Sequence, residues 1–354
     1  MEQKIIYTNF VEETVDRLIG EMSPASVFIL VDHNTCERVL PRLRSVCTSL
    51  KDAIVISVKP GDENKNLDSL SYIWQEMSNK GATRNSLLIN LGGGVVTDMG
   101  AFAASTFKRG IAFINIPTTL LGAVDAAIGG KTGINFNGLK NEIGSFKPAD
   151  AVIISTTFLV TLPIEEIKSG YAEMIKHAMI SDSRTLKDLL KTDINAIDPN
   201  AMLKLVEEST KVKKAIVEKD PEEKGLRKAL NFGHTVGHAF ESLALERKSP
   251  ISHGYAVAYG MVVETVISAL KRKFPVETMR KLASYIFENY QGFGFSCEDY
   301  DRLIDFMKHD KKNTARGEIS MTLLNNVGDI SINNNIKEDE IKAAFDIYRE
   351  ELQK

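Results

Sequence analysis

The sequence has few cysteines, little net charge and no long apolar run. Its 354 residues include three scattered cysteines, Cys36, Cys47 and Cys297, with no CxxC spacing, which indicates a reducing compartment. The formal net charge of −3 provides no basic face for nucleic acid. No apolar run reaches the roughly 18 residues of a membrane span, and residues 1–4 show no signal-peptide pattern. We therefore expect a cytoplasmic protein with small-molecule partners, no nucleic acid and no membrane.

Five short apolar runs in the first half predict a parallel sheet with covered faces. The runs alternate with amphipathic stretches, which is typical of strand–helix–strand units. They occupy residues 26–31, 53–58, 86–91, 111–116 and 151–154. We therefore expect residues 1–162 to form an α/β domain of Rossmann-like architecture.

The second half has a different pattern, with apolar residues recurring at helical spacing in 164–190, 201–218 and 257–273. This pattern predicts a mainly α-helical domain at residues 163–354. A hydrophobic content of 43% and a charged content of 26% are typical of a soluble globular chain, and the length suits two domains.

A glycine turn follows the strand expected at 86–91. Gly92-Gly93-Gly94 would place backbone N–H groups and a helix N-terminus where a pyrophosphate can bind. The third glycine of a GxGxxG pattern is replaced by Thr97, so a tight turn without a ligand is the alternative. Pro117-Thr118-Thr119 ends the next strand, and open α/β sheets bind ligands outside their strands' carboxyl ends. Asp32 ends an earlier strand, where it either accepts a hydrogen bond from a ribose hydroxyl or forms a turn.

Glycine and lysine are also dense in Gly129-Gly130-Lys131-Thr132-Gly133 and in Lys140-Asn141-Glu142-Ile143-Gly144. This density predicts a loop wrapped around an anion. The segment differs from a P-loop because position 125 holds Asp125 instead of glycine, which argues against a nucleoside triphosphatase.

Three of the six histidines lie within residues 227–254. His234 and His238 are four residues apart, so on a helix they share one face and could address one metal, phosphate or proton. His253 lies in the next segment, and Glu173 could add the carboxylate that suits a divalent ion beside imidazole. A histidine pair at this spacing also occurs as a capped or core-satisfied pair. The ligand hypothesis is favoured by three cations, Lys176, Lys213 and Arg227.

Taken in order along the chain, these motifs resemble the 3-dehydroquinate synthase family from about Asp32 to Gly317. Related sugar-phosphate cyclases and glycerol dehydrogenase-like metal enzymes share the fold and parts of the pattern. The matching segments are Gly92-Gly93-Gly94-Val95-Val96, Arg109-Gly110, Pro117-Thr118-Thr119-Leu120-Leu121, Gly129-Gly130-Lys131-Thr132-Gly133, Lys140-Asn141-Glu142-Ile143-Gly144, Ala172-Glu173-Met174-Ile175-Lys176, Leu226-Arg227, Asn231-Phe232-Gly233-His234-Thr235 and Asp310-Lys311-Lys312.

The resemblance implies one Zn2+ or Co2+ held by Glu173, His234 and His253. It leaves His238 to contact the substrate or support the site, and His177 to a structural role. It implies NAD+ bound by residues of the first domain: Asp32, Asp62, Lys65, Gly93, Gly94, Asp98, Thr118, Thr119, Lys131, Lys140, Phe158 and Thr161.

The implied activity converts 3-deoxy-D-arabino-heptulosonate 7-phosphate into 3-dehydroquinate and phosphate through transient oxidation, β-elimination, reduction, ring opening and aldol closure. Catalytic roles are implied for Lys176, Asn141, His238 and Lys213. Arg109 would reach in from a second subunit, which implies a homodimer. The implied substrate-binding residues are Asp125, Lys131, Asn141, Lys176, Lys213, Arg227, Asn231, His238, Arg109 and one of Lys311 and Lys312.

The sequence departs from the family pattern at three places. Thr97 replaces a common glycine, Asp62 a common glutamate, and Ala126-Ala127 small hydroxyl residues, so details of NAD contact are affected. Other functions considered are a different sugar-phosphate cyclase, a glycerol dehydrogenase-like enzyme and a non-catalytic nucleotide-binding protein. Asn231 and His238 favour dehydroquinate formation.

Overall fold

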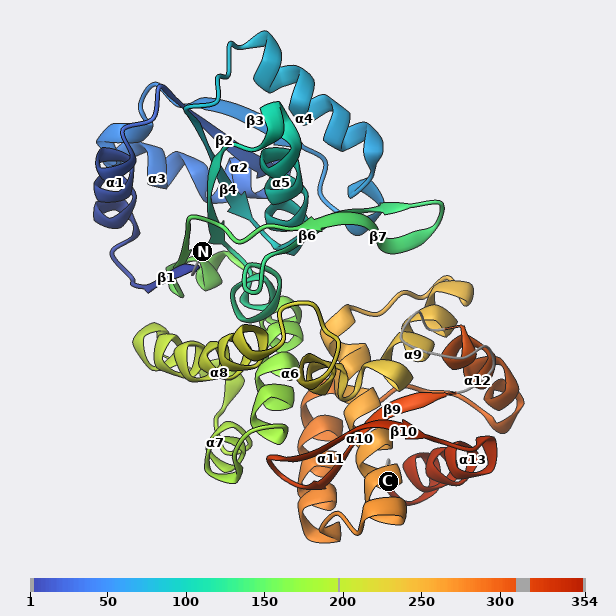
Figure 1. Ribbon diagram of the computed structural model, residues 1–354. Helices are drawn as coiled ribbons and strands as arrows, with labels where there is room; N and C mark the ends of the chain where they lie inside the picture. Colours follow the sequence, from blue (N-terminus) through green and yellow to red (C-terminus); the bar gives the residue numbers. More distant parts are fainter. Residues whose placement is uncertain (1–2, 197, 310–318, 353–354) are drawn as a thin grey trace. The chain divides into compact units, whose positions relative to one another are not determined.

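The computed structural model describes residues 3–196, 198–309 and 319–352 (Figure 1). The chain forms two compact units. Unit 1 comprises Met1–Pro163 and Ile197–Thr210, and unit 2 comprises Ile164–Ala196 and Lys211–Lys354. The first break therefore falls one residue beyond the expected boundary, and a short later segment also belongs to unit 1.

Unit 1 is built on a six-stranded sheet with the order β1-β8-β5-β4-β2-β3, and the strand pairs are parallel. Five of these strands coincide with the five apolar runs. The sixth, β1, is a four-residue edge strand, too short and too exposed to stand out in the sequence. The bounds are β1 Lys4–Tyr7, β2 Ser26–Asp32, β3 Ile54–Val58, β4 Ser86–Gly92, β5 Ala112–Pro117 and β8 Ala151–Ile154.

Helices cover both faces of this sheet, which explains why all seven residues of β4 are buried. Apolar residues of α1 and α3 form one core with alternate residues of β2, β4 and β5. On the other face, a Cβ on Gly100 of α5 would lie 2.0 Å from Asn90 Oδ1 on β4, so only glycine permits this approach. The helices are α1 Val11–Met22, α2 His33–Arg38, α3 Leu40–Val46, α4 Leu67–Asn79 and α5 Gly94–Thr106.

The segment predicted as an anion-binding loop is instead a β-hairpin. Strands β6 (Lys131–Phe136) and β7 (Leu139–Phe146) pair antiparallel. The glycines have a packing role here, because a Cβ on Gly144 would lie 2.0 Å from the Thr132 carbonyl oxygen across the hairpin. The expectation of a loop was therefore wrong, since glycine density reflected close strand pairing.

Unit 2 is mainly helical, as expected, and is organised around α10. This helix contacts α6, α9, α11 and strand β9, and its residues from Ala256 to Ser268 are buried. No helix in the described part of the chain is long and apolar enough to span a membrane. The elements are α6 Ile164–Met179, α7 Ser183–Leu189, α8 Pro199–Lys219, α9 His234–Glu246, α10 His253–Arg272, α11 Val276–Tyr290, α12 Tyr300–Lys308, β9 Ser320–Asn326, β10 Asp329–Asn335 and α13 Glu338–Ile347; the first twelve residues of α8 belong to unit 1.

Two features of unit 2 differ from the sequence expectation. The helix expected at 164–190 is two helices, α6 and α7, because α6 ends at Met179. Asp182 caps α7 by accepting hydrogen bonds from the N–H groups of Arg184 and Thr185 at 2.9 and 3.0 Å. The hairpin of β9 and β10 was not expected. Its second strand, β10, is mostly polar and has few apolar residues, so its sequence shows little of the alternation that indicates a strand.

Candidate active site

The predicted NAD-binding residues of unit 1 follow three neighbouring strands. Because β2, β4 and β5 are adjacent and parallel, their carboxyl ends bring Asp32, Gly93 and Thr118 to one edge of the sheet. The Thr118 N–H donates to the Gly92 carbonyl at 2.9 Å, which joins two of the turns. A Cβ on Gly93 would lie 3.1 Å from Thr119 Cγ2, so the two loops are in close contact.

The third glycine position is held by Thr97, which is buried in α5 and donates through Oγ1 to the Gly94 carbonyl at 3.1 Å. Close packing of α5 on β4 falls instead to Gly100. Gly94 opens the helix, and a Cβ there would lie 3.2 Å from Ala126 Cβ. The departure at Thr97 therefore leaves the glycine turn intact, and these residues fit a pyrophosphate at the start of α5.

A second group in unit 1 is organised by Lys65, whose side chain is only 4% exposed. Its Nζ donates to Asp98 Oδ2 at 2.6 Å and to Asn141 Oδ1 at 2.5 Å. Lys140 Nζ lies 3.7 Å from Asp62 Oδ2. The structure thus brings together five predicted site residues from the β3–α4 connection, α5 and the β6–β7 hairpin.

Other predicted NAD residues have local contacts of their own. Asp32 Oδ1 accepts from the Thr35 N–H at 2.7 Å and so caps α2, which is the turn-forming role that the sequence left open. Phe158 and Thr161 share a 3₁₀ turn in which Thr161 Oγ1 donates to the Phe158 carbonyl at 2.7 Å. Among the described residues, the second Asp32 oxygen accepts no hydrogen bond, so it is available to a ligand.

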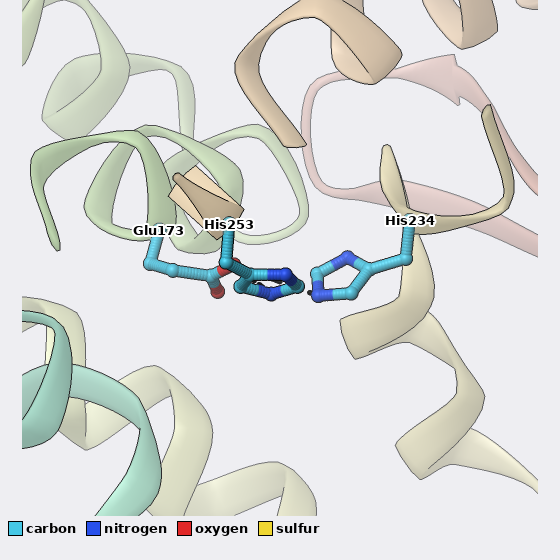
Figure 2. A group of neighbouring side chains, drawn as sticks. All are labelled: Glu173, His234 and His253. Carbon is cyan, nitrogen blue, oxygen red and sulfur yellow. Dashed lines mark ion pairs between the residues drawn. The ribbon is translucent and has the colours of Figure 1, made fainter. Parts of the chain in front are cut away.

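In unit 2, Glu173, His234 and His253 point toward one another (Figure 2). They come from α6, the first residue of α9 and the first residue of α10. The two histidine Nε2 atoms approach the same Glu173 oxygen, Oε1, at 3.5 Å for His234 and 3.9 Å for His253. One ligand atom from each residue lies within 4.8 Å of the others.

The donor set fits a divalent metal ion. A tetrahedral centre with bonds near 2.1 Å separates its ligand atoms by about 3.4 Å, close to the separations of 3.5 and 3.9 Å from Glu173 Oε1. Glu173 is 0% exposed, and within residues 3–196, 198–309 and 319–352 neither of its oxygens accepts a hydrogen bond of ordinary geometry. A buried carboxylate needs compensation. The ion pair with Lys176 supplies part of it, and a cation among these three residues would supply the rest.

Buried polar and glycine contacts set the start of α9. Gly233, with φ +79°, is the N-cap residue of α9 and has no side chain that could cap the helix. Glu264 of α10 takes this role, because its carboxylate accepts from the N–H groups of Gly233 and Val236 at 2.6 and 3.1 Å. His234 Nδ1 lies 3.2 Å from the Phe232 carbonyl, which turns Nε2 toward Glu173.

Three predicted substrate cations of unit 2 are buried: Lys176 is 1%, Lys213 5% and Arg227 3% exposed. Burying cationic side chains is costly unless anions accompany them. Arg227 is held by its own loop, since Nη1 donates to the Pro221 carbonyl at 2.7 Å. Asn231 donates to Glu223 Oε1 at 2.9 Å. Such a set of cations suits a substrate with a phosphate and a carboxylate.

Models of one protein family match most of the chain. A sequence model of the 3-dehydroquinate synthase N-terminal part matches residues 55–169, and that of the C-terminal part matches residues 170–313. The chain belongs to the 3-dehydroquinate synthase family. The 3-dehydroquinate synthase of Parabacteroides distasonis is 48% identical over 349 residues, covering 99% of this chain and 98% of that protein.

Two solved structures share the fold of this family member. One is 2-deoxy-scyllo-inosose synthase complexed with carbaglucose-6-phosphate, NAD+ and Co2+, with a TM-score of 0.85, 23% identity, and coverage of 98% of this chain and 96% of that chain. The other is 2-epi-5-epi-valiolone synthase from Streptomyces hygroscopicus with NAD+ and Zn2+ bound, with a TM-score of 0.83, 21% identity, and coverage of 99% and 97%. The expected fold class is confirmed.

The remaining residues that the family resemblance implies lie on other elements or outside the described residues. Arg109, with φ +69°, lines a surface hollow of unit 1 with Thr83, Arg84 and Lys108, and no other predicted site residue lines this hollow in the described chain. Asp125 and Lys131 lie in unit 1, at a π-helical turn and at the start of β6. Lys311 and Lys312 lie outside the described residues.

The sequence interpretation missed three carboxylates that lie beside site residues or the start of α9: Asp220, Glu241 and Glu264. Glu264 lies in an apolar helix, where a lone carboxylate signals a buried polar partner. Glu241 follows His234 by seven residues and His238 by three, so it lies near the histidine face of α9. Asp220 begins a Pro- and Gly-containing loop, a common position for a side chain that binds backbone N–H groups.

Proposed function

We propose that this chain catalyses conversion of 3-deoxy-D-arabino-heptulosonate 7-phosphate to 3-dehydroquinate and phosphate, as a cytoplasmic carbon–oxygen lyase of the shikimate pathway. Family membership over nearly the whole chain supports the reaction. The observation that carries the proposal is the convergence of Glu173, His234 and His253 in a unit that also buries Lys176, Lys213 and Arg227. Metal ligands and anion-binding cations together are what a phosphorylated polyol substrate requires.

Glu173, His234 and His253 would hold one Zn2+ or Co2+, and the glycine turn with the Lys65 group would hold NAD+. When bound, the metal supplies Lewis acidity and NAD+ a transient oxidation and later reduction of the substrate alcohol. The donor set of two imidazoles and a carboxylate fits either metal.

The remaining work falls to side chains that hold one flexible substrate through several steps. Lys176, Lys213 and Arg227 would bind its phosphate and carboxylate. Lys131, Asp125 and one of Lys311 and Lys312 would also bind the substrate. Asn141, Asn231 and His238 would bind its hydroxyls and orient them for elimination, ring opening and aldol closure. Orientation of this kind is a large source of rate in intramolecular reactions.

We further propose that the enzyme works as a homodimer in which Arg109 serves the site of the second copy. The hollow that contains Arg109 holds three cationic side chains, which suits contact with an anionic ligand or an acidic surface of a partner. Sedimentation with and without substrate, together with activity of mixed dimers of Arg109→Ala and Glu173→Ala chains, tests this arrangement.

The reaction is tested with less NAD+ than substrate. A cyclase returns the hydride to the bound substrate, so each NAD+ should support many turnovers, with one phosphate released per dehydroquinate and no lasting rise in NADH absorbance. Accumulation of NADH in step with product would contradict the proposal and would indicate a glycerol dehydrogenase-like reaction.

A further inference from the structure

The His253 ring lies between two carboxylates. Its Nε2 is 3.9 Å from Glu173 Oε1, and its Nδ1 is 3.5 Å from Glu241 Oε2. Two groups of potential metal ligands therefore share this histidine: Glu173, His234 and His253 form one, and His238, Glu241 and His253 form the other. A neutral imidazole offers one lone pair, so a single ion takes one of these nitrogens while the other carries a proton.

Burial and geometry favour the Nε2 side for the metal. Glu173 is 0% exposed, whereas Glu241 is 18% exposed and so retains contact with water. The Nε2 atoms of both His234 and His253 also approach one oxygen of Glu173. With the ion on this side, His253 Nδ1 carries the proton and faces the carboxylate of Glu241.

We propose that Glu241 is a positioning residue for the metal site, holding His253 by accepting a hydrogen bond from Nδ1–H; the inference rests on the proposed metal ligands. Metal-bound histidines regularly donate their outer N–H to a carboxylate or a backbone carbonyl, which fixes the ring and raises its basicity. The pair is 3.5 Å apart here, so a small ring rotation completes the bond.

The two histidines are supported in different ways. His234 Nδ1 lies 3.2 Å from the Phe232 backbone carbonyl, which no substitution removes. His253 depends on a side chain from a neighbouring helix. Helix α9 thus contributes the ligand His234 and, seven residues later, Glu241, which supports the ligand His253 of α10. Glu241 links the two helices at the point where they must hold one ion.

The test is Co2+ binding by Glu241→Ala and Glu241→Gln, measured by chelator competition and by the visible absorption spectrum of bound Co2+. We expect Glu241→Ala to bind one equivalent with affinity about 10- to 100-fold weaker and with shifted absorption bands. Glu241→Gln should recover most of the affinity because its amide oxygen still accepts from Nδ1–H. Glu246→Ala is the matched control, since Glu246 ends the same helix and pairs with Arg302 at the surface.

Equal affinity and an unchanged spectrum in Glu241→Ala would overturn the inference. Complete loss of Co2+ in both Glu241 variants, with retention in Glu173→Ala, would also overturn it by making Glu241 a ligand. Melting temperatures in the presence of a chelator show whether each variant is folded. Because Co2+ binding is measured without substrate, these outcomes do not depend on whether the wild-type protein forms dehydroquinate.

Discussion

Units 1 and 2 position their candidate ligand groups by different means. In unit 1, Asp32, Gly93 and Thr118 follow the ends of adjacent parallel strands, so the backbone of the sheet places them. In unit 2, Glu173, His234 and His253 come from three helices. Their separation depends on how closely α6, α9 and α10 approach one another.

That approach depends on glycines and buried carboxylates. A Cβ on Gly260 of α10 would lie 2.0 Å from the Gly233 carbonyl oxygen, and one on Gly254 would lie 2.0 Å from the Ser169 carbonyl oxygen on α6. Glu264 then joins α10 to the start of α9. A sheet edge follows from strand order, whereas a centre between helices requires particular side chains at each contact.

The largest expected effect is loss of metal when a ligand is removed. Glu173→Ala, His234→Ala and His253→Ala should each be purified without stoichiometric metal, because two remaining donors hold a divalent ion weakly. His238→Ala should retain metal. Elemental analysis measures the metal content of the four variants, and circular dichroism checks that each is folded.

Glu173→Ala also leaves Lys176 buried without its ion-pair partner, and breaking a buried pair costs about 3–5 kcal/mol. Glu173→Gln serves as a second variant that keeps the side-chain volume. Loss of metal in His238→Ala with retention in His253→Ala would show that the three ligands have been wrongly assigned.

The next largest effect on Co2+ affinity should come from a residue that is not itself a metal ligand. Gly260→Ala forces α9 and α10 apart, since its Cβ would also lie 2.6 Å from the Gly237 nitrogen. Overpacking of this kind destabilises proteins by about 1–3 kcal/mol, and Co2+ affinity should fall with it. Gly294→Ala is the control, because no atom lies within 4 Å of the added Cβ. Equal thermal unfolding and Co2+ affinity in the two variants would contradict this account.

The same contrast explains what the sequence could predict. The five apolar runs correctly predicted five strands, and the three glycines correctly predicted a turn after β4. Both features are determined by local sequence patterns. Residue types alone suggested Glu173 and His253 as candidate ligands, and the family resemblance fixed the set with His234. No local pattern reveals that these three residues converge. The β6–β7 hairpin was mistaken for a loop because glycine is common in both. Glu241 and Glu264 were missed because their role depends on which helices meet.

A third prediction assigns NAD+ binding to unit 1 and phosphate binding to unit 2. Arg227→Ala should weaken inhibition by inorganic phosphate by one to two powers of ten, since a charge-assisted hydrogen bond contributes about 1.5–3 kcal/mol, while NAD+ affinity is retained. Lys65→Ala should weaken NAD+ binding and retain inhibition by phosphate, because Lys65 joins Asp98 and Asn141 in unit 1. Titration calorimetry with NAD+ and steady-state inhibition by phosphate measure both. A parallel loss of both affinities in either variant would show that the sites are not separable.

The smallest effect should be a pH dependence of the loop that carries Arg227. The Asp220 carboxylate accepts from the N–H groups of Arg227, Gly225 and Lys224 at 2.9, 2.7 and 3.0 Å. These hydrogen bonds, led by that from Arg227, lower the pKa of Asp220 below its ordinary value of 3.8.

Because the unfolded chain then binds the proton more tightly, the contribution of Asp220 to stability is fully present above its ordinary pKa and is lost as the pH falls through the lowered value. Asp220→Asn cannot titrate, so its deficit in unfolding free energy should be constant near pH 7 and should shrink on acidification below about pH 4. Denaturant unfolding of both proteins in chelator, from pH 7 downward, measures this difference. Glu222→Gln is the control, because Glu222 lies in the same loop and forms an ion pair with exposed Lys224. Its difference in unfolding free energy from the wild type should not shrink in this way on acidification. A deficit in Asp220→Asn that stays constant to the lowest pH at which the protein folds would mean that Asp220 holds the Arg227 loop equally well when protonated.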